Sequence, residues 1–510
     1  MAKTALAGPF LLESPMPPKK PKPDSDNQLG LFGESAPEAL APAFKPVSKS
    51  EFIAGWQCDK YLWLDRHERR SRSVDPMSQF LMQQGSAVGK LAQGLFSDAK
   101  YEVEAVALGA MARADIVRRQ NGKLLIYEVK SSGYDPENPY KENKEEYIWD
   151  LALQVYVFEG SGQAVDKAHL VLINKDFVKQ GPIDPHLFFN IEDVTSQVRE
   201  LLPRVEKALA HFKLILSQPQ APDVAIDTHC RSPHDCPWQE RCYPVQGPGH
   251  IFKLRMLFWR DKFKLFHQGV TSITEYSGKL DSWQAKQVEV FKSQAPHIEK
   301  EAIQAFIAKL RYPLYHLDFE TYNPAIPAFD GTRPNRQNVF QYSLHIQDSP
   351  GAAPRHFEYL PEHQGDPRRE LLEKLLGELG ESGSILAYYA SFEIERLKEL
   401  AIAFPEYESK IQAALKRFED LEKPFSSGHY IHPQMEGKSS IKNVLPALVP
   451  SMTYKGMAVA DGLGAIRAYA EILDAKTTEA RRAELRKDLK AYCGQDTLAM
   501  VEILRVLESL

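Results

Sequence analysis

The stretch of residues 111–132 places the strongest local constraint on how this chain folds. Runs of β-branched and aliphatic residues flank Asn121 and Gly122. An Asn-Gly pair favours a two-residue hairpin turn, because both central positions of such a turn need a positive φ. The turn sets the register of the two strands, so Asp115 is expected directly opposite Glu128.

The two opposed carboxylates indicate more than a structural hairpin. Opposed residues in an antiparallel pair have Cβ atoms about 4.5–5.5 Å apart, so the charges of Asp115 and Glu128 repel each other. A divalent cation between them removes that penalty. Lys130 follows Glu128 by two residues and therefore projects to the same face. The alternative is a surface hairpin with an exposed Glu and Lys.

An Asp followed by Glu-x-Lys on the next strand of a hairpin resembles the site of PD-(D/E)XK nucleases. The resemblance implies that Asp115 and Glu128 hold Mg²⁺ or Mn²⁺, which activates water for attack on a phosphodiester. It also implies that Lys130 stabilises charge or positions the nucleophile. This constellation predicts a nuclease site at the hairpin.

The segments around the hairpin fit that family. Helical spacing is found over residues 78–96 and 145–160, and a strand-like run follows at residues 169–174. In the RecB-like branch, a Gln and a Tyr on the second helix help to bind DNA. This implies a role for Gln154, whereas Tyr156 is a weaker match because the usual spacing is longer.

Four cysteines bracket this part of the chain. Cys230, Cys236 and Cys242 follow one another at equal spacing, and Cys58 precedes the hairpin. Four thiolates suit an iron-sulfur cluster or zinc, and the lack of Cys-x-x-Cys pairs favours the cluster. The set resembles the 4Fe-4S ligands of RecB-like CRISPR-associated nucleases and of the AddB helicase-nuclease subunit. Reduced, buried cysteines without a metal are the alternative.

A second set of acidic residues lies in the C-terminal part. Asp318 and Glu320 share one face at the end of a predicted buried strand, and Glu393 lies on a helix after a short strand. Tyr492 and Asp496 are spaced i, i+4 on one helical face. These three motifs resemble those of DEDD-type 3'-to-5' exonucleases, which have an RNase H-like fold.

Those exonucleases hold two metal ions and therefore need four carboxylates. The implied ligands are Asp318, Glu320, Glu393 and Asp496. The resemblance implies that Tyr492 orients the attacking water. Glu393 stands where the family usually has Asp, with Asp420 as a weaker substitute candidate. Cys493 is expected to pack within its helix, and Lys442 is expected to be solvated rather than bound to substrate phosphate.

Both halves together resemble the bacterial family catalogued as domain of unknown function 2779, on the motifs EVKSS, YPLYHLDFET and YCGQDT and on the cysteine cluster. The predicted fold is a mixed α/β protein with a PD-(D/E)XK restriction-endonuclease-like domain and an RNase H-like DEDD exonuclease-type domain. The expected parts are a disordered Pro-rich tail (1–47), the RecB-like domain with the cysteine cluster (48–245), a helical connector (246–310) and the exonuclease-type domain (311–510).

The tail contains a short apolar peptide, Gln28-Leu29-Gly30-Leu31-Phe32. It resembles the QLxLF-type peptide by which bacterial replication and repair proteins dock on the sliding clamp, with a chance apolar cluster as the alternative. The net charge of -5 argues against a protein that coats duplex DNA by charge. No apolar run is long enough to cross a bilayer and no signal-peptide pattern is present, so a cytoplasmic location is expected.

The motifs together predict metal-dependent hydrolysis of phosphodiester bonds, with DNA favoured over RNA, in DNA repair or defence. Two alternatives stay open. One is a nucleic-acid-binding or clamp-recruited scaffold with one or both centres inactive, and Glu393 makes the second centre the expected silent one. The other is an RNA-directed exonuclease, because no residue here identifies a 2'-hydroxyl from sequence alone.

Overall fold

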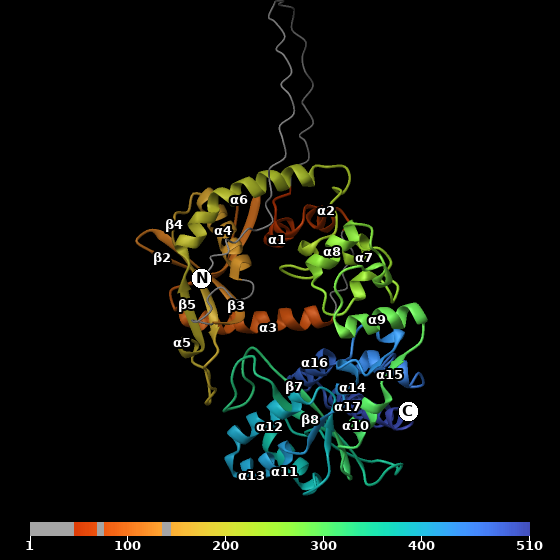
Figure 1. Cartoon of the computed structure of the whole chain (residues 1–510). Coiled ribbons are helices and arrows are strands. Elements are labelled where there is room, and N and C mark those ends of the chain that lie inside the picture. The colour runs from red at the N-terminus through yellow and green to blue at the C-terminus, as the bar shows by residue number, and fades with distance from the viewer. Residues whose placement is uncertain (1–44, 69–75, 135–143) are drawn as a thin grey trace, which may run out of the picture.

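Two five-stranded sheets organise the two halves of the protein (Figure 1), the first carrying Asp115 and Glu128 and the second carrying Asp318 and Glu320. In the computed structural model, residues 45–68, 76–134 and 144–510 are described, and they form a mixed α/β protein. The peptide Gln28-Leu29-Gly30-Leu31-Phe32, which resembles clamp-binding peptides, lies outside these residues. Val47, which was assigned to the tail, is buried and forms a β-bridge with Ala110, so the folded part begins before residue 48.

The first sheet is an antiparallel meander that a parallel strand extends. Its strand order is β1-β2-β3-β4-β5, with β3 and β4 parallel and the other neighbours antiparallel. The elements of this half are α1 (Lys49–Gln57), α2 (Asp59–His67), α3 (Pro76–Ala92), β1 (Lys100–Ala107), β2 (Ala110–Gln120), β3 (Lys123–Tyr134), α4 (Lys144–Gly160), β4 (Val165–Asn174), α5 (Pro185–Phe188), β5 (Phe189–Asp193) and α6 (Thr195–Leu216).

The hairpin between β2 and β3 has the predicted turn and register. Asn121 and Gly122 have φ angles of 50° and 80°, which is the left-handed backbone that a two-residue turn requires. Five residue pairs follow the expected register, beginning with Gln120 opposite Lys123. The turn and these five pairs are therefore confirmed, and the pairing ends with Ile116 opposite Tyr127, one position before Asp115 and Glu128.

Helix α4 lies between the first sheet and α6 and is apolar around most of its circumference, because both neighbours bury it. Trp149 and Leu153 are among its fully buried side chains. The polar exceptions are Asp150 and Gln154, which are also buried and lie one helical turn apart. Their burial creates a need for polar partners inside this core.

The second sheet has the strand order β11-β10-β7-β8-β9. The strands β7, β8 and β9 form an antiparallel meander, and β10 and β11 continue the sheet in parallel on the other side of β7. Its elements are β7 (Leu314–Tyr322), β8 (Asn338–Gln347), β9 (Arg355–Tyr359), α11 (Arg368–Glu378), β10 (Ile385–Ala387), α12 (Ser391–Ala403), α13 (Glu408–Leu415), β11 (Phe418–Asp420), α14 (Lys423–Ser426), β12 (Tyr430–Ile431), α15 (Ile441–Leu448), α16 (Gly462–Leu473) and α17 (Glu479–Glu508).

The segment predicted as a helical connector is only partly a connector. It contains α8 (Trp259–His267), α9 (Ser282–Ser293), β6 (His297–Ile298) and α10 (Lys300–Ile307). Strand β6 pairs with β12, and Ile303 and Phe306 of α10 pack in a core of the C-terminal half. The end of this segment is therefore built into the second half.

The two halves also touch through α3, which lies between them in Figure 1. Phe80 of α3 packs in one core cluster with Tyr322, Phe340 and Tyr469. The backbone of Lys179 also exchanges hydrogen bonds with the loop that follows β7. These contacts join the first half to the strand that carries the second acidic motif.

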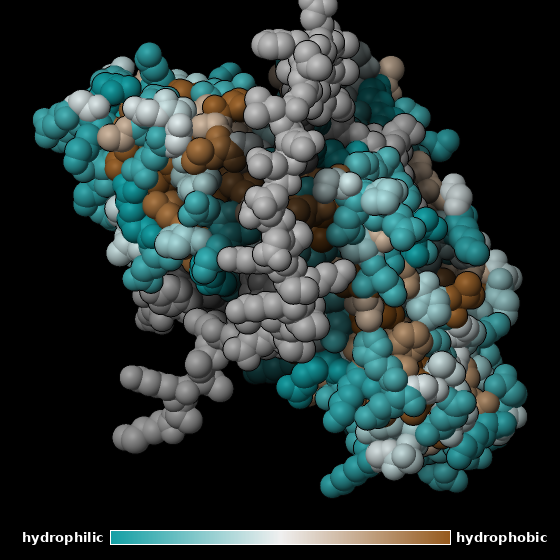
Figure 2. Space-filling model, turned by 90° about the horizontal axis from the view of Figure 1, so that it is seen from above, coloured by the Kyte–Doolittle hydropathy of each residue, from teal (hydrophilic) through white to brown (hydrophobic). Residues whose placement is uncertain are grey.

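Hydrophilic side chains cover most of the described surface on the face seen in Figure 2, with hydrophobic side chains gathered in the recessed areas. Among the described residues, no helix combines the length and apolar character that a membrane crossing requires.

Candidate functional site

The first centre is built around the buried carboxylate of Glu128 on β3. Lys130 Nζ lies 2.7 Å from Glu128 Oε1 and 2.8 Å from Asp150 Oδ2. Gln154 Nε2 donates a hydrogen bond to the other oxygen, Glu128 Oε2, at 2.7 Å. The structure thus brings Glu128, Lys130 and Gln154 into direct contact.

Two residues of this centre were missed by sequence reasoning. Lys49 Nζ on α1 lies 2.5 Å from Glu128 Oε1 and 2.6 Å from Asp150 Oδ2. Asp150 precedes Gln154 by one helical turn, so helical spacing could have indicated it. Lys49 lies far from the hairpin in the sequence, and only the packing of α1 brings it to this centre.

The pKa of Asp115 and the pKa of Glu128 are shifted in opposite directions. Burial and the charge of Glu128 raise the pKa of Asp115 to about 7. Burial alone would also raise the pKa of Glu128, but Lys130 and Lys49 hold it well below its usual range. Asp115 Oδ2 accepts a hydrogen bond from the backbone N–H of Val129 at 2.8 Å. Burial and the charge of Glu128 also raise the pKa of Asp150, so a cation would stabilise both Asp115 and Asp150.

Tyr156 does not join the first centre. It is partly buried against the first core, and the charge that affects its pKa is that of Glu206 on α6. Residues two apart on a helix point in different directions, so Gln154 and Tyr156 cannot both face Glu128.

The second centre is a pocket of about 540 Å³ formed by β7, α12 and α17. Strand β7 supplies two acids from one face, α12 supplies one from its first turn, and α17 supplies an acid and a tyrosine from one face. The residues of the three motifs that line this pocket are Asp318, Glu320, Glu393, Tyr492 and Asp496. The structure thus brings together all five.

These four carboxylates are crowded and lack a paired cation. No lysine or arginine in the described part of the chain forms an ion pair with any of them. Burial and mutual repulsion raise the pKa of Asp318 and of Glu320 well above their usual ranges. Burial also raises the pKa of Glu393 to about 8 and that of Asp496 to about 6. The pocket therefore takes up either protons or cations.

Residues 315–440 match the family model described as "Domain of unknown function (DUF2779)". This region belongs to the DUF2779 family. The match contains Asp318, Glu320 and Glu393, and it ends before Tyr492 and Asp496.

Two relatives are themselves described as uncharacterized proteins. "Uncharacterized protein UU173" of Ureaplasma parvum is 29% identical over 235 residues, which cover 42% of this chain and 34% of the relative. "Uncharacterized protein MG366 homolog" of Mycoplasma pneumoniae is 27% identical over 216 residues, which cover 38% of this chain and 32% of the relative. The chain thus spans about a third of the length of the curated relatives it matches.

Three further residues also surround the acids of this pocket. The hydroxyl of Tyr454 donates a hydrogen bond to Asp496 Oδ1 at 2.5 Å. Lys442 is exposed, as expected, and it also lines the pocket, with Nζ 5.9 Å from the ring centroids of Tyr454 and Tyr492. Asp461 also lines the pocket, from the N-cap of α16. Each reaches the pocket from a separate segment, so no local spacing could have indicated it.

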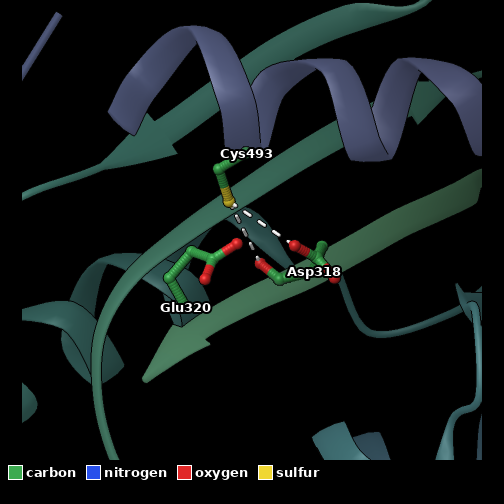
Figure 3. Close-up of side chains that lie close together, drawn as sticks. All are labelled: Asp318, Glu320 and Cys493. Atoms are coloured by element: carbon green, nitrogen blue, oxygen red, sulfur yellow. Dashed lines mark hydrogen bonds between the residues drawn. The ribbon is translucent and has the colours of Figure 1, made fainter. Parts of the chain in front are cut away.

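Two further expectations about the DUF2779 pocket are changed by the structure. Cys493 does more than pack within α17, because its Sγ lies 3.6 Å from Asp318 Oδ2 (Figure 3). Asp420 is absent from the pocket lining, and its Oδ1 accepts hydrogen bonds from the backbone N–H groups of Tyr389 and Glu422. Glu393, rather than Asp420, is the third acid of the pocket.

The four predicted cysteine ligands line one small pocket between α2 and the segment around α7 (Gln239–Cys242). They are Cys58, Cys230, Cys236 and Cys242, and none of them forms a disulfide. Burial raises the pKa of Cys230 and of Cys236 to about 11. Gln57 Nε2 donates hydrogen bonds to the backbone carbonyls of His229 and His234, both at 2.7 Å, and so fixes the segment that carries Cys230 and Cys236.

The donor set of this pocket is four thiolates, which suits an iron-sulfur cluster or a zinc ion. A tetrahedral zinc site with Zn–S distances of about 2.3 Å needs sulfurs about 3.8 Å apart. No three of these four described sulfurs lie within 4.8 Å of one another. A four-iron cluster has thiolates on separate irons and accepts the wider spacing.

We expect the lysines of the first centre to differ in their contribution to stability. Lys130→Met should lower the free energy of unfolding by about 3 kcal/mol, because it removes one of two cations from two buried carboxylates. Lys49→Met should cost less, because the side chain of Lys49 is 36% exposed and that of Lys130 is 19% exposed. Urea unfolding at pH 7 with a chelator present measures both.

The matched control is Lys167→Met, which removes a surface ion pair with Asp193. It should cost less than about 1 kcal/mol, since exposed pairs contribute little. Equal losses in all three variants would contradict the assignment of Lys130 and Lys49 to a buried network.

Proposed function

We propose that this protein is a metal-dependent nuclease that hydrolyses phosphodiester bonds, with DNA as its preferred polymer, and that it acts in repair or defence. One observation carries the proposal. Three buried carboxylates, the partly buried carboxylate of Asp318 and a tyrosine line a single pocket in the C-terminal half, and the described residues offer these acids no ion-pairing cation. Hard divalent cations such as Mg²⁺ and Mn²⁺ favour such oxygen ligands.

The strand orders support this proposal. In the second sheet, an antiparallel meander is followed by two parallel strands beyond its first strand, which is the arrangement we expect of an RNase H-like domain. In the first half, the order of helix, three-stranded meander, helix and strand is the order that a PD-(D/E)XK core requires.

In the second centre, Asp318, Glu320, Glu393 and Asp496 would hold the metal ions. When bound, such ions polarise the phosphate and lower the pKa of water. The hydroxyl of Tyr492 orients the attacking water. Tyr454 fixes the orientation of Asp496 through its hydrogen bond, and Lys442 offsets phosphate charge at the rim of the pocket.

In the first centre, Asp115 and Glu128 would hold a metal ion, with Lys130 positioning the nucleophile and Gln154 orienting Glu128. One observation favours a second candidate function for this half. Lys49 and Lys130 both lie against Glu128 Oε1, and both also lie against Asp150. Their charges already neutralise these carboxylates, which suits a nucleic-acid-binding scaffold in which the first centre is silent.

Two further parts of the proposal concern cofactor and partner. The four cysteines would hold a 4Fe-4S cluster that joins α2 to the segment around α7, and its role is structural. The peptide Gln28-Leu29-Gly30-Leu31-Phe32 would dock on the sliding clamp. Binding of a synthetic peptide of residues 27–33 to a bacterial sliding clamp tests this part. If the clamp does not bind the peptide, the clamp is not a partner.

We expect the two centres to be separable by mutation. End-labelled single- and double-stranded DNA and RNA are incubated with Mg²⁺ or Mn²⁺ and wild type, Lys130→Ala, Asp318→Ala or the double variant. Asp318→Ala should slow the removal of terminal nucleotides at least about 100-fold, because it removes a metal ligand. Lys130→Ala should remove any product pattern that belongs to the first centre.

Asp348→Asn is the matched control for Asp318→Ala, since Asp348 pairs with Arg355 on the surface, outside the pocket. It should leave the rates unchanged. If wild type and the double variant are equally inert on every polymer, the scaffold function replaces the nuclease. Faster cutting of RNA than of DNA would select the RNA-directed alternative.

We expect the protein to be brown when it is purified without oxygen and to contain about four iron atoms per chain. Cys230→Ser should lose the colour, whereas Cys493→Ala should keep it, because Cys493 lies in the other half. Iron analysis and visible absorption measure both. A colourless protein with one zinc ion per chain would contradict the cluster.

A further inference from the structure

Cys493 is fully buried beside the second acidic pocket, and its side chain points from α17 toward Asp318 and Glu320 on β7 (Figure 3). Its Sγ lies 3.6 Å from Asp318 Oδ2 and 3.9 Å from the backbone oxygen of Asp318. One ligand atom each of Asp318, Glu320 and Cys493 lie within 4.8 Å of one another. Among the described residues, they form the one group of this kind.

The distances fit coordination of a single cation by oxygen and sulfur. With a metal–sulfur distance of about 2.3 Å and a metal–oxygen distance of about 2.1 Å, a tetrahedral site separates sulfur from oxygen by about 3.6 Å. The separation of Sγ and Asp318 Oδ2 has this value. A weak S–H···O hydrogen bond has a similar length, so a second observation must distinguish the two.

Glu393 provides that observation. Its side chain is only 2% exposed and lines the same pocket, yet Glu393 Oε2 has no hydrogen-bond partner among the described residues. A buried carboxylate oxygen without a partner is costly. If Cys493 only donated a hydrogen bond to Asp318, Glu393 would stay unsatisfied. A cation in the pocket gives Glu393 a positive charge nearby as well.

The sulfur changes which cation this pocket prefers. Mg²⁺ binds oxygen ligands at near-octahedral geometry and has little affinity for thiolate. Cations of the Zn²⁺ and Co²⁺ type accept both thiolate and carboxylate. A pocket with only carboxylates would give a weaker preference and no sulfur-to-metal absorption band, and a serine at position 493 would restore an all-oxygen set.

We propose that Asp318, Glu320 and Cys493 together bind one thiolate-accepting divalent cation of the Zn²⁺ class in preference to Mg²⁺. The proposal rests on the proposed nuclease function, because it names the metal that the second centre uses. Binding releases the thiol proton to solvent and leaves a thiolate on the metal. No oxidation or reduction takes place.

The test is a Co²⁺ titration of the full-length chain, with the four-cysteine site left as purified. Wild type should gain a near-ultraviolet sulfur-to-cobalt absorption band that Cys493→Ser lacks, and Asp318→Asn should also lose it. Loss of an outer-shell partner of a metal ligand costs 10–100-fold in affinity, so loss of the ligand itself in Cys493→Ser should weaken Co²⁺ binding by about 100-fold or more. In wild type, millimolar Mg²⁺ should fail to displace Co²⁺, and this measurement needs no variant.

An unchanged Co²⁺ affinity and spectrum in Cys493→Ser, or ready displacement of Co²⁺ by Mg²⁺ in wild type, would overturn the proposal. Hydrolysis assays separate this failure from that of the nuclease. If Mn²⁺ supports cutting but no cobalt–sulfur band forms, the nuclease stands and the thiolate site fails. If the band forms and no polymer is cut, the thiolate site stands and the nuclease fails.

Discussion

Burial of carboxylates is the constraint on which both centres depend. An ionised carboxylate in a protein interior is costly unless a positive charge and hydrogen bonds compensate for lost water. In the first centre, Lys49 and Lys130 supply that charge from within the chain, and Glu128 stays ionised. In the second centre, no described lysine or arginine pairs with the acids, and burial raises their pKa values. The buried carboxylates are therefore compensated by lysines of the chain itself in the first centre. In the second centre, their compensation requires a bound cation or protons.

This contrast changes which of the two centres we expect to be catalytically active. From sequence, Glu393 in place of Asp made the second centre the expected silent one. In the structure, Glu393 lines the pocket with the other three acids, and the longer side chain still reaches it. The first centre has the cleaner motif, but its lysines already occupy Glu128. We therefore place the stronger case for metal-dependent chemistry in the DUF2779 half.

The packing of helices against the two sheets explains how the buried polar groups of both centres are held in place. Helix α4 is enclosed by the first sheet and α6, so the polar groups of Asp150 and Gln154 must find partners inside the protein, and Lys130 and Glu128 provide them. Helix α17 packs along the second sheet and presents three residues of one face to β7. In both halves, a helix buried against a sheet fixes the side chains, which limits the freedom lost on binding.

Sequence alone determined the features that depend on local geometry. Asn121 and Gly122 specified the hairpin and its register, strand alternation placed Asp318 and Glu320 on one face, and helical spacing did the same for Tyr492 and Asp496. Only the tertiary structure decided which distant segments meet. Lys49, Tyr454 and the thiol of Cys493 reach the centres through packing between segments far apart in the chain. Strand and helix periods repeat over a few residues, whereas contacts between distant segments depend on how whole elements pack, so no local pattern records them.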